Sequence, residues 1–103
     1  MSAPVENVVT LDGYQDAARR TINQGLTDNH RLLDASAGLA EEAGEVLSHV
    51  RKYVLQGRPL DRDALALELG DALWCLAIAA DTLGVSLQEV AQRNVEKLRS
   101  RYP

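Results

Sequence analysis

Five carboxylates lie at close intervals in two short stretches of the sequence, in the order Glu-Glu-x-x-Glu and then Glu-x-x-Asp. They are Glu41, Glu42, Glu45, Glu68 and Asp71. Helix positions three or four apart share one side, so the first three acids would occupy two turns of one edge with no lysine or arginine among them. Like charges at this spacing repel. Mg²⁺ typically binds one or two carboxylates together with waters and substrate phosphates, so the pattern indicates a Mg²⁺ site at which a phosphate-bearing substrate could bind.

The second pair of acids has an unusual setting. Glu68 and Asp71 directly precede an apolar run, residues 72–80, and would lie at the mouth of the core. Any one of the five acids is explained equally well by a solvent-exposed helix face. Two acidic motifs in succession, the second within an otherwise apolar helix, are harder to explain by solubility and favour metal binding.

A polar group interrupts the apolar stripe of the last expected helix. The apolar members of this stripe are Leu87, Val90, Ala91 and Leu98. Asn94 falls among them, so we expect its amide to point inward, with Lys97 and Arg101 on the same side. An amide and two cations could hold phosphate oxygens opposite the metal. A buried asparagine bonded to the backbone, beside two cations whose stems cover apolar surface, explains the same pattern.

Other common types of site are not indicated. His30 and His49 lack the spacing that a zinc site or a di-iron carboxylate site requires, and there is no Gly-x-x-x-x-Gly-Lys phosphate loop. The single cysteine, Cys75, lies in the apolar run and should behave as a small hydrophobe.

Charge and hydropathy limit the partners. The formal net charge is −4 and the pI is about 5.0, so we expect no nucleic-acid partner, although a nucleotide bridged by a metal remains compatible with this charge. The start of the chain, residues 1–6, lacks the features of a signal peptide, and the nine-residue apolar run is about half of the roughly 20 residues that span a membrane. We therefore expect a cytoplasmic protein with no membrane partner.

The remaining sequence predicts an all-α fold in one domain, residues 1–103. We expect helices over about residues 11–22, from a cap at Asp28 or Asn29 to about residue 55, from a cap at Asp61 to about residue 83, and from a cap at Ser86 to about residue 101. Gly84 suits the left-handed position after a helix end. The third helix is apolar on every side over residues 72–80, so we expect it to be covered on all faces, with a second subunit as part of the cover.

Three segments in this order resemble the MazG-like nucleotide pyrophosphohydrolases of the all-α NTP pyrophosphohydrolase superfamily. They are residues 39–46 (LAEEAGEV), 68–74 (ELGDALW) and 94–103 (NVEKLRSRYP), and the Tyr14-Gln15 pair is also similar to the family. The resemblance covers most of the chain and implies a four-helix MazG-like bundle that assembles with a second subunit, as a homodimer or homotetramer.

The resemblance also implies an activity and assigns roles. Nucleoside triphosphates would be hydrolysed between the α and β phosphates, giving the monophosphate and pyrophosphate, with Mg²⁺ required and Mn²⁺ as a substitute. The metal ligands would be Glu42, Glu45, Glu68 and Asp71. Glu41 would orient or deprotonate the attacking water, and Asn94 and Lys97 would contact the phosphates or nucleotide, with Arg101 beside them.

Two other functions remain compatible with the sequence. The chain could be a non-catalytic helical module that binds a nucleotide or a partner helix, or a phosphohydrolase for another pyrophosphate-containing metabolite. The base preference cannot be read, since Trp74 could equally be a core residue or a stacking platform.

Overall fold

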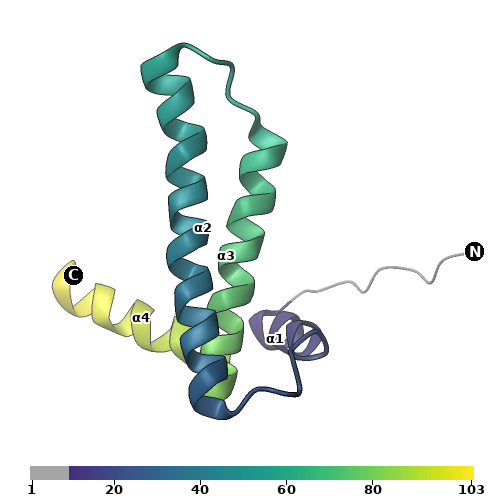
Figure 1. Ribbon diagram of the computed structural model, residues 1–103. Helices are drawn as coiled ribbons and strands as arrows, with labels where there is room; N and C mark the ends of the chain where they lie inside the picture. Colours follow the sequence, from purple (N-terminus) through teal and green to yellow (C-terminus); the bar gives the residue numbers. More distant parts are fainter. Residues whose placement is uncertain (1–9) are drawn as a thin grey trace, which may run out of the picture.

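Four helices follow one another along residues 10–103, which are the part of the chain that the computed structural model describes, and no strand occurs in that part. The helices are α1 (Leu11–Arg19), α2 (Asp28–Gln56), α3 (Arg62–Thr82) and α4 (Leu87–Arg101) (Figure 1). The predicted all-α fold is confirmed. Residues 1–9, including the segment in which we found no signal peptide, lie outside the described residues. Among the described residues, no helix is long and apolar enough to cross a membrane.

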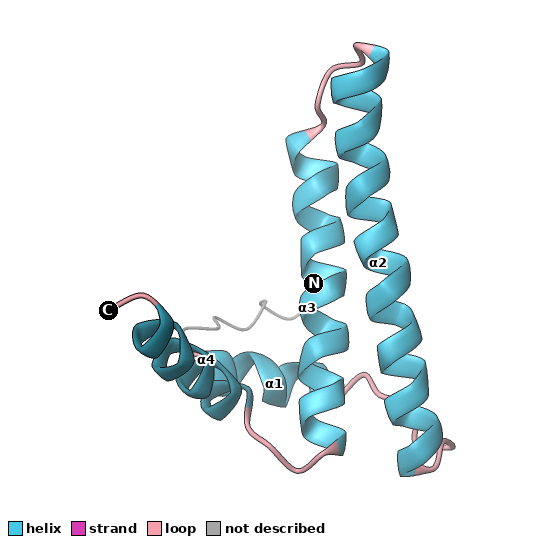
Figure 2. Ribbon diagram, turned by 90° about the vertical axis from the view of Figure 1, so that its left-hand side faces the viewer, coloured by secondary structure: helices cyan, strands magenta, loops and turns pink. Residues whose placement is uncertain are grey.

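Helices α2 and α3 form an antiparallel pair that dominates the molecule (Figures 1 and 2). At 29 residues α2 is about 43 Å long. It ends at Gly57, whose φ of 66° is the left-handed conformation that glycine adopts without strain. Asp61 then caps α3 by accepting a hydrogen bond from the Ala64 amide at 3.0 Å, as predicted. The short connection therefore brings the two acidic stretches to face each other across one helix pair.

Two helix ends differ from the prediction. Helix α1 ends at Arg19 rather than near Ile22, because the next amides bond three residues back, in tighter turns that leave the α-helical path. Helix α2 is capped by Thr27 rather than by Asp28 or Asn29. Thr27 Oγ1 accepts from the His30 amide at 3.2 Å, which leaves Asp28 in the first turn, where a negative charge is stabilised by the helix dipole.

The corner between α3 and α4 is joined to α1 by one buried side chain. Gly84 adopts a φ of 74° and Ser86 caps α4 by accepting from the Glu89 amide at 3.0 Å, both as predicted. The Gln15 side chain, only 3% exposed, donates to Val85 O at 3.1 Å and to Ala77 O at 3.3 Å. It also accepts from the Leu87 amide at 2.9 Å, an N-terminal helix amide with no partner inside its own helix. Gln15 therefore fixes the direction in which α4 leaves the corner.

The buried core lies at one end of the α2/α3 pair, where α1 and α4 pack. Its buried members are Ala18, Ala35, Ala77, Ile78 and Leu87. The other end of the pair is largely uncovered, and Leu47, Val54, Leu55 and Leu67 are each more than 60% exposed. The radius of gyration, 16.2 Å, exceeds the roughly 13 Å typical of a compact chain of this length.

One chain does not by itself form a closed four-helix bundle. Helix α4 packs on α1 and α3, makes no contact with α2, and diverges from the α2/α3 pair in both views (Figures 1 and 2). The sequence predicts that α3 is covered on all faces, with a second subunit as part of the cover. A single chain leaves part of α3 exposed. Cys75, Ala77 and Ile78 are buried, whereas Leu76 is 45% exposed.

Candidate metal centre and adjoining cavity

Three of the five predicted acids converge between α2 and α3. Glu42 comes from α2, and Glu68 and Asp71 come from the facing stretch of α3; each offers an oxygen, and these atoms all lie within 4.8 Å of one another. Glu42 and Glu68 are half-buried, and Asp71 is exposed. The set consists of hard oxygen donors that open to solvent on one side, which suits a divalent cation that keeps waters or phosphate oxygens among its ligands.

Glu42 is the most perturbed acid in this cluster. A hydrogen bond with Glu68 raises the pKa of Glu42 to about 7, with further contributions from burial and from the charges of Glu68, Asp71 and Glu45. When both carboxylates are ionised, no donor reaches the buried Oε2 atom of Glu42. A buried, unpartnered carboxylate oxygen is costly unless a cation or proton compensates it. The carboxylates therefore fit a divalent metal, which would supply the missing positive charge.

Glu41 and Glu45 are exposed and are not part of this converging set. Glu41 instead lines the adjoining cavity and has no hydrogen-bonding or ionic partner among the described residues. Glu45 is near enough to Glu42 for its charge to raise the pKa of Glu42. His49 is half-buried, and its Nε2 lies 3.9 Å from Glu68 Oε1.

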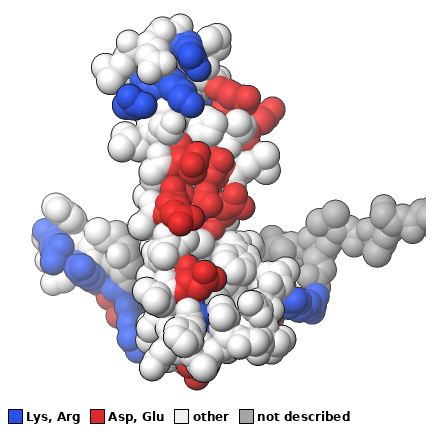
Figure 3. All heavy atoms as spheres, in the orientation of Figure 1, with Lys and Arg blue, Asp and Glu red and all other residues white. Residues whose placement is uncertain are grey.

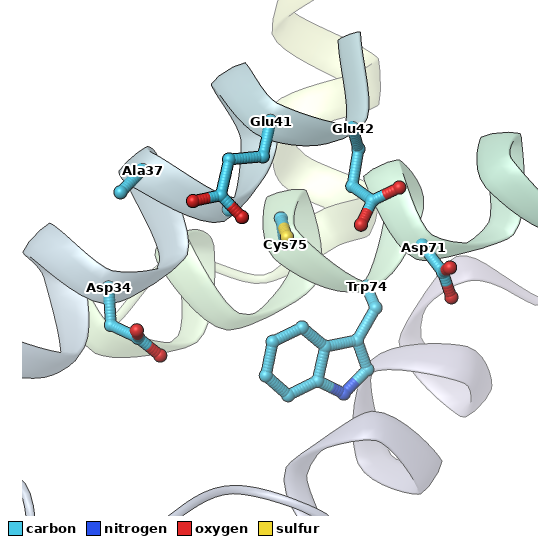
Figure 4. Close-up of a pocket in the computed structure, with 8 residues that line it drawn as sticks. Asp34, Ala37, Glu41, Glu42, Asp71, Trp74 and Cys75 are labelled. Carbon is cyan, nitrogen blue, oxygen red and sulfur yellow. The ribbon is translucent and has the colours of Figure 1, made fainter. Parts of the chain in front are cut away.

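A cavity of about 310 Å³ begins at Glu42 and Asp71 and extends along α2 (Figure 4). The remaining residues of its wall are Asp34, Ala37, Gly38, Glu41, Trp74 and Cys75. A Cβ atom on Gly38 would lie 3.0 Å from Cys75 Sγ, so the glycine permits the close approach of α2 to α3 here. Burial raises the pKa of the Cys75 thiol, and the Glu42 charge adds to this, which agrees with an unreactive cysteine.

The sequence motifs did not assign Asp34 to the site, and they left the role of Trp74 open. The helical spacing of both residues from the acidic motifs nevertheless indicates that they lie on the same side as the acids. Asp34 lies seven residues before Glu41, two turns along the same edge of α2, and Trp74 follows Asp71 by three residues on α3. Periodicity extended beyond the acidic motifs would have placed them beside the cluster.

The predicted phosphate-binding residues do not join the acids within one chain. Asn94, Lys97 and Arg101 are all exposed on α4, so the prediction that the Asn94 amide points inward is wrong for the single chain. The reason is that the apolar stripe of α4 is itself partly uncovered, with Val90 43% and Leu98 46% exposed. Figure 3 shows acidic side chains gathered midway along the α2/α3 pair and basic side chains along α4, separated across the surface.

Comparison with known proteins agrees with the family resemblance of the sequence motifs. The family model described as the MazG nucleotide pyrophosphohydrolase domain matches residues 31–103, a range that contains all five acids and α4. The gene 37 protein of Mycobacterium phage L5 is 39% identical over 99 residues, covering 88% of this chain and 87% of the phage protein. The uncharacterized protein YvdC of Bacillus subtilis (strain 168) is 38% identical over 73 residues, covering 62% of this chain and 69% of that protein. No solved structure gives a significant match.

Proposed function

Because the chain belongs to the MazG nucleotide pyrophosphohydrolase domain family, we propose that it hydrolyses nucleoside triphosphates to the monophosphate and pyrophosphate in a Mg²⁺-dependent reaction. The observation that carries the proposal is the juxtaposition of the Glu42, Glu68 and Asp71 oxygens, within 4.8 Å of one another, with a cavity of about 310 Å³. Ligand cavities begin at about this size. Removal of unwanted nucleotides from the pool is a role that fits such an activity.

The metal would be held by Glu42, Glu68 and Asp71, with Glu45 as a further ligand from the exposed edge of α2. The buried and unpartnered Oε2 of Glu42 supports this assignment, since it requires a cation or a proton. Bound Mg²⁺, or Mn²⁺ in its place, lowers the pKa of water and neutralises charge on phosphate oxygens. The acids of the chain hold the cation at the mouth of the cavity, where the phosphates of a nucleotide inside it would lie.

Glu41 is the proposed general base. Its carboxylate lines the cavity beside Glu42 and has no partner among the described residues, so it is available to accept a proton (Figure 4). It would orient the attacking water toward the α phosphorus and accept its proton as the bond to the leaving pyrophosphate breaks.

The active form is proposed to be a homodimer or homotetramer. Leu69, Leu76 and Leu83 recur at intervals of seven residues on one side of α3, and are 55%, 45% and 63% exposed. Gly44 and Gly70 lie within helices, yet a Cβ on either would meet nothing within 4 Å. Interior glycines cost a helix about 1 kcal/mol each relative to alanine, so close approach of another chain would account for them.

Assembly would also complete the site. Since α4 makes no contact with α2 of its own chain, Asn94, Lys97 and Arg101 would have to come from a partner subunit to contact the phosphates. Cations from a second copy would balance an acidic cluster that has no lysine or arginine in its own cavity wall.

The deciding experiment is incubation with a panel of NTPs and dNTPs plus Mg²⁺, scored separately for pyrophosphate and orthophosphate. We expect pyrophosphate and the monophosphate in equal amounts, with no release in EDTA or by Asp71→Asn. Release of orthophosphate would show cleavage at another bond and refute the proposal. Nucleotide binding without turnover would identify a non-catalytic module. If no nucleotide in the panel is bound or hydrolysed, the proposed substrate class is wrong, and other pyrophosphate-containing metabolites become the candidates.

A further inference from the structure

The cavity continues beyond the carboxylates of Glu42, Glu68 and Asp71 into a region that the proposed hydrolysis does not use. Its part near Glu42 and Asp71 adjoins the proposed metal, whereas Trp74 and Asp34 lie further along the wall (Figure 4). A volume of about 310 Å³ is at the lower limit for ligand cavities and suits a nucleoside rather than a whole triphosphate. If the phosphates of a nucleotide lie at the acids, its base therefore lies toward Trp74.

The Trp74 indole is held in one orientation. Its Nε1 donates to Thr21 Oγ1 at 2.7 Å, and Thr21 Oγ1 in turn donates to the Ala18 carbonyl at 2.7 Å. The indole also packs against the core cluster while lining the cavity. Because its only N–H is already used, Trp74 can offer the cavity its aromatic surface but no hydrogen bond. A fixed aromatic surface is suited to stacking a nucleobase, and stacking does not distinguish strongly among bases.

Discrimination among bases requires a polar group, and Asp34 is the candidate. Its carboxylate lies on the same edge of α2 as Glu41, lines the cavity, and has no hydrogen-bonding or ionic partner among the described residues. The side chains between them in the wall, Ala37 and Gly38, are small and leave room for a planar ligand. An ionised carboxylate only accepts hydrogen bonds. It therefore binds an amino group and repels a carbonyl oxygen.

We propose that Trp74 stacks the base of the nucleotide and that Asp34 accepts a hydrogen bond from its exocyclic amino group. The substrates would then be nucleotides of amino-bearing bases, such as cytosine and adenine, in preference to the keto bases uracil and hypoxanthine. This inference rests on the proposed function for its orientation of the nucleotide, with phosphates at the acids. It assigns specificity to residues outside the two acidic motifs.

Binding can be tested without turnover, because Trp74 is the only tryptophan of the chain and its fluorescence reports on this cavity alone. The full-length protein would be titrated with CMP, AMP, UMP and ribose 5-phosphate in the presence of Mg²⁺, with excitation at the red edge of the indole band. We expect saturable quenching by CMP and AMP, quenching by UMP only at roughly tenfold or higher concentration, and none by ribose 5-phosphate. No change with any base, in protein that releases pyrophosphate, would refute stacking on Trp74.

The selectivity of Asp34 is tested with matched substrates that differ in an amino or keto group, CTP against UTP and ATP against ITP. We expect kcat/KM to favour the amino member of each pair by about tenfold or more, because a site built around one hydrogen bond rejects the analogue that lacks it. Asp34→Asn, whose amide can donate to a carbonyl, should lower this ratio by about tenfold. Asp63→Asn, an exposed acid outside the cavity, should leave it unchanged. An unaltered ratio in Asp34→Asn would overturn the role of Asp34.

Failure of this inference can be told from failure of the proposed function. Trp74→Leu should raise the KM for CTP by about tenfold, and Trp74→Phe, which keeps an aromatic surface, should restore most of it. Circular dichroism of both variants checks that the helices are retained. Quenching by CMP without pyrophosphate release would refute hydrolysis but would still support the base site. Hydrolysis of CTP, UTP, ATP and ITP at equal rates would refute the base site alone.

Discussion

The raised pKa of Glu42 predicts that metal binding depends strongly on pH between 6 and 8. Its hydrogen bond with Glu68, together with burial and three neighbouring carboxylates, raises the pKa to about 7 in the metal-free protein. A divalent cation binds the ionised carboxylate, so it must displace the proton from any Glu42 that carries one. The acid is about nine-tenths ionised at pH 8 and about one-tenth ionised at pH 6. The apparent dissociation constant for Mg²⁺ should therefore rise about tenfold from pH 8 to pH 6.

The same shift determines how the stability of the metal-free protein changes with pH. The folded state binds the Glu42 proton more tightly than the unfolded state, whose pKa is near the ordinary value of 4.5. Between about pH 4.5 and pH 7 the folded state thus carries more protons, and the free energy of unfolding falls as the pH rises through this range. A metal that binds only the folded state offsets this loss. Its effect on the melting temperature should be larger at pH 8 than at pH 6.

Isothermal titration calorimetry in buffers of different ionisation enthalpy measures the Mg²⁺ affinity and the number of protons released on binding. It should show about one proton released per metal bound at pH 6 and almost none at pH 8. Glu42→Gln, which cannot ionise, is the matched control and should remove both the proton release and the pH step. Equal Mg²⁺ affinity at pH 6 and pH 8, without proton release, would refute the assignment of Glu42 as a ligand that titrates near neutrality.

Three further predictions concern catalysis, assembly and folding. Glu41→Gln should lower kcat by about 10²–10⁴-fold while calorimetry still detects metal binding, and near-normal kcat would exclude Glu41 as the base. Asp71→Asn and Lys97→Ala should each be inactive alone. When the two variants are mixed and reassembled, half of the dimers contain one copy of each and have one intact site of two, so about a quarter of the wild-type rate should return. No recovery would show that each site takes both residues from one chain. Gln15→Leu should lower the free energy of unfolding in urea by about 3 kcal/mol, because the buried Leu87 amide and the half-buried Val85 O would lose their partner. A loss under about 1 kcal/mol would show that water replaces Gln15.

Features set by nearby residues were predicted well from the sequence. The caps at Asp61 and Ser86 and the left-handed Gly84 depend on one side chain and the backbone within a few residues, so their residue types identify them. The antiparallel α2/α3 pair agrees with the short connection, which favours that arrangement. Once that pair is given, the spacing of the acids brings Glu42 to Glu68 and Asp71.

Apart from the end of α1 and the cap of α2, what the sequence did not predict depends on distant parts of the chain or on another chain. The inward direction expected for Asn94 assumed that the apolar stripe of α4 faces a core of its own chain, and that stripe is half exposed. The position of Trp74, which the sequence left open between the core and a binding surface, depends on Thr21, which lies 53 residues away and accepts the indole hydrogen bond. A hydropathy pattern states that a face is apolar, but it does not state which surface covers that face.

The placement of the core at one end of the α2/α3 pair has a consequence for how the protein responds to dilution. The far end carries exposed side chains such as Leu47, Val54 and Leu67, and contributes little to the stability of a single chain. If a second copy covers these leucines and valines, the free energy of assembly becomes part of the free energy of folding. The melting temperature should then rise with protein concentration, and dilution should reduce heat resistance and specific activity over the same concentration range.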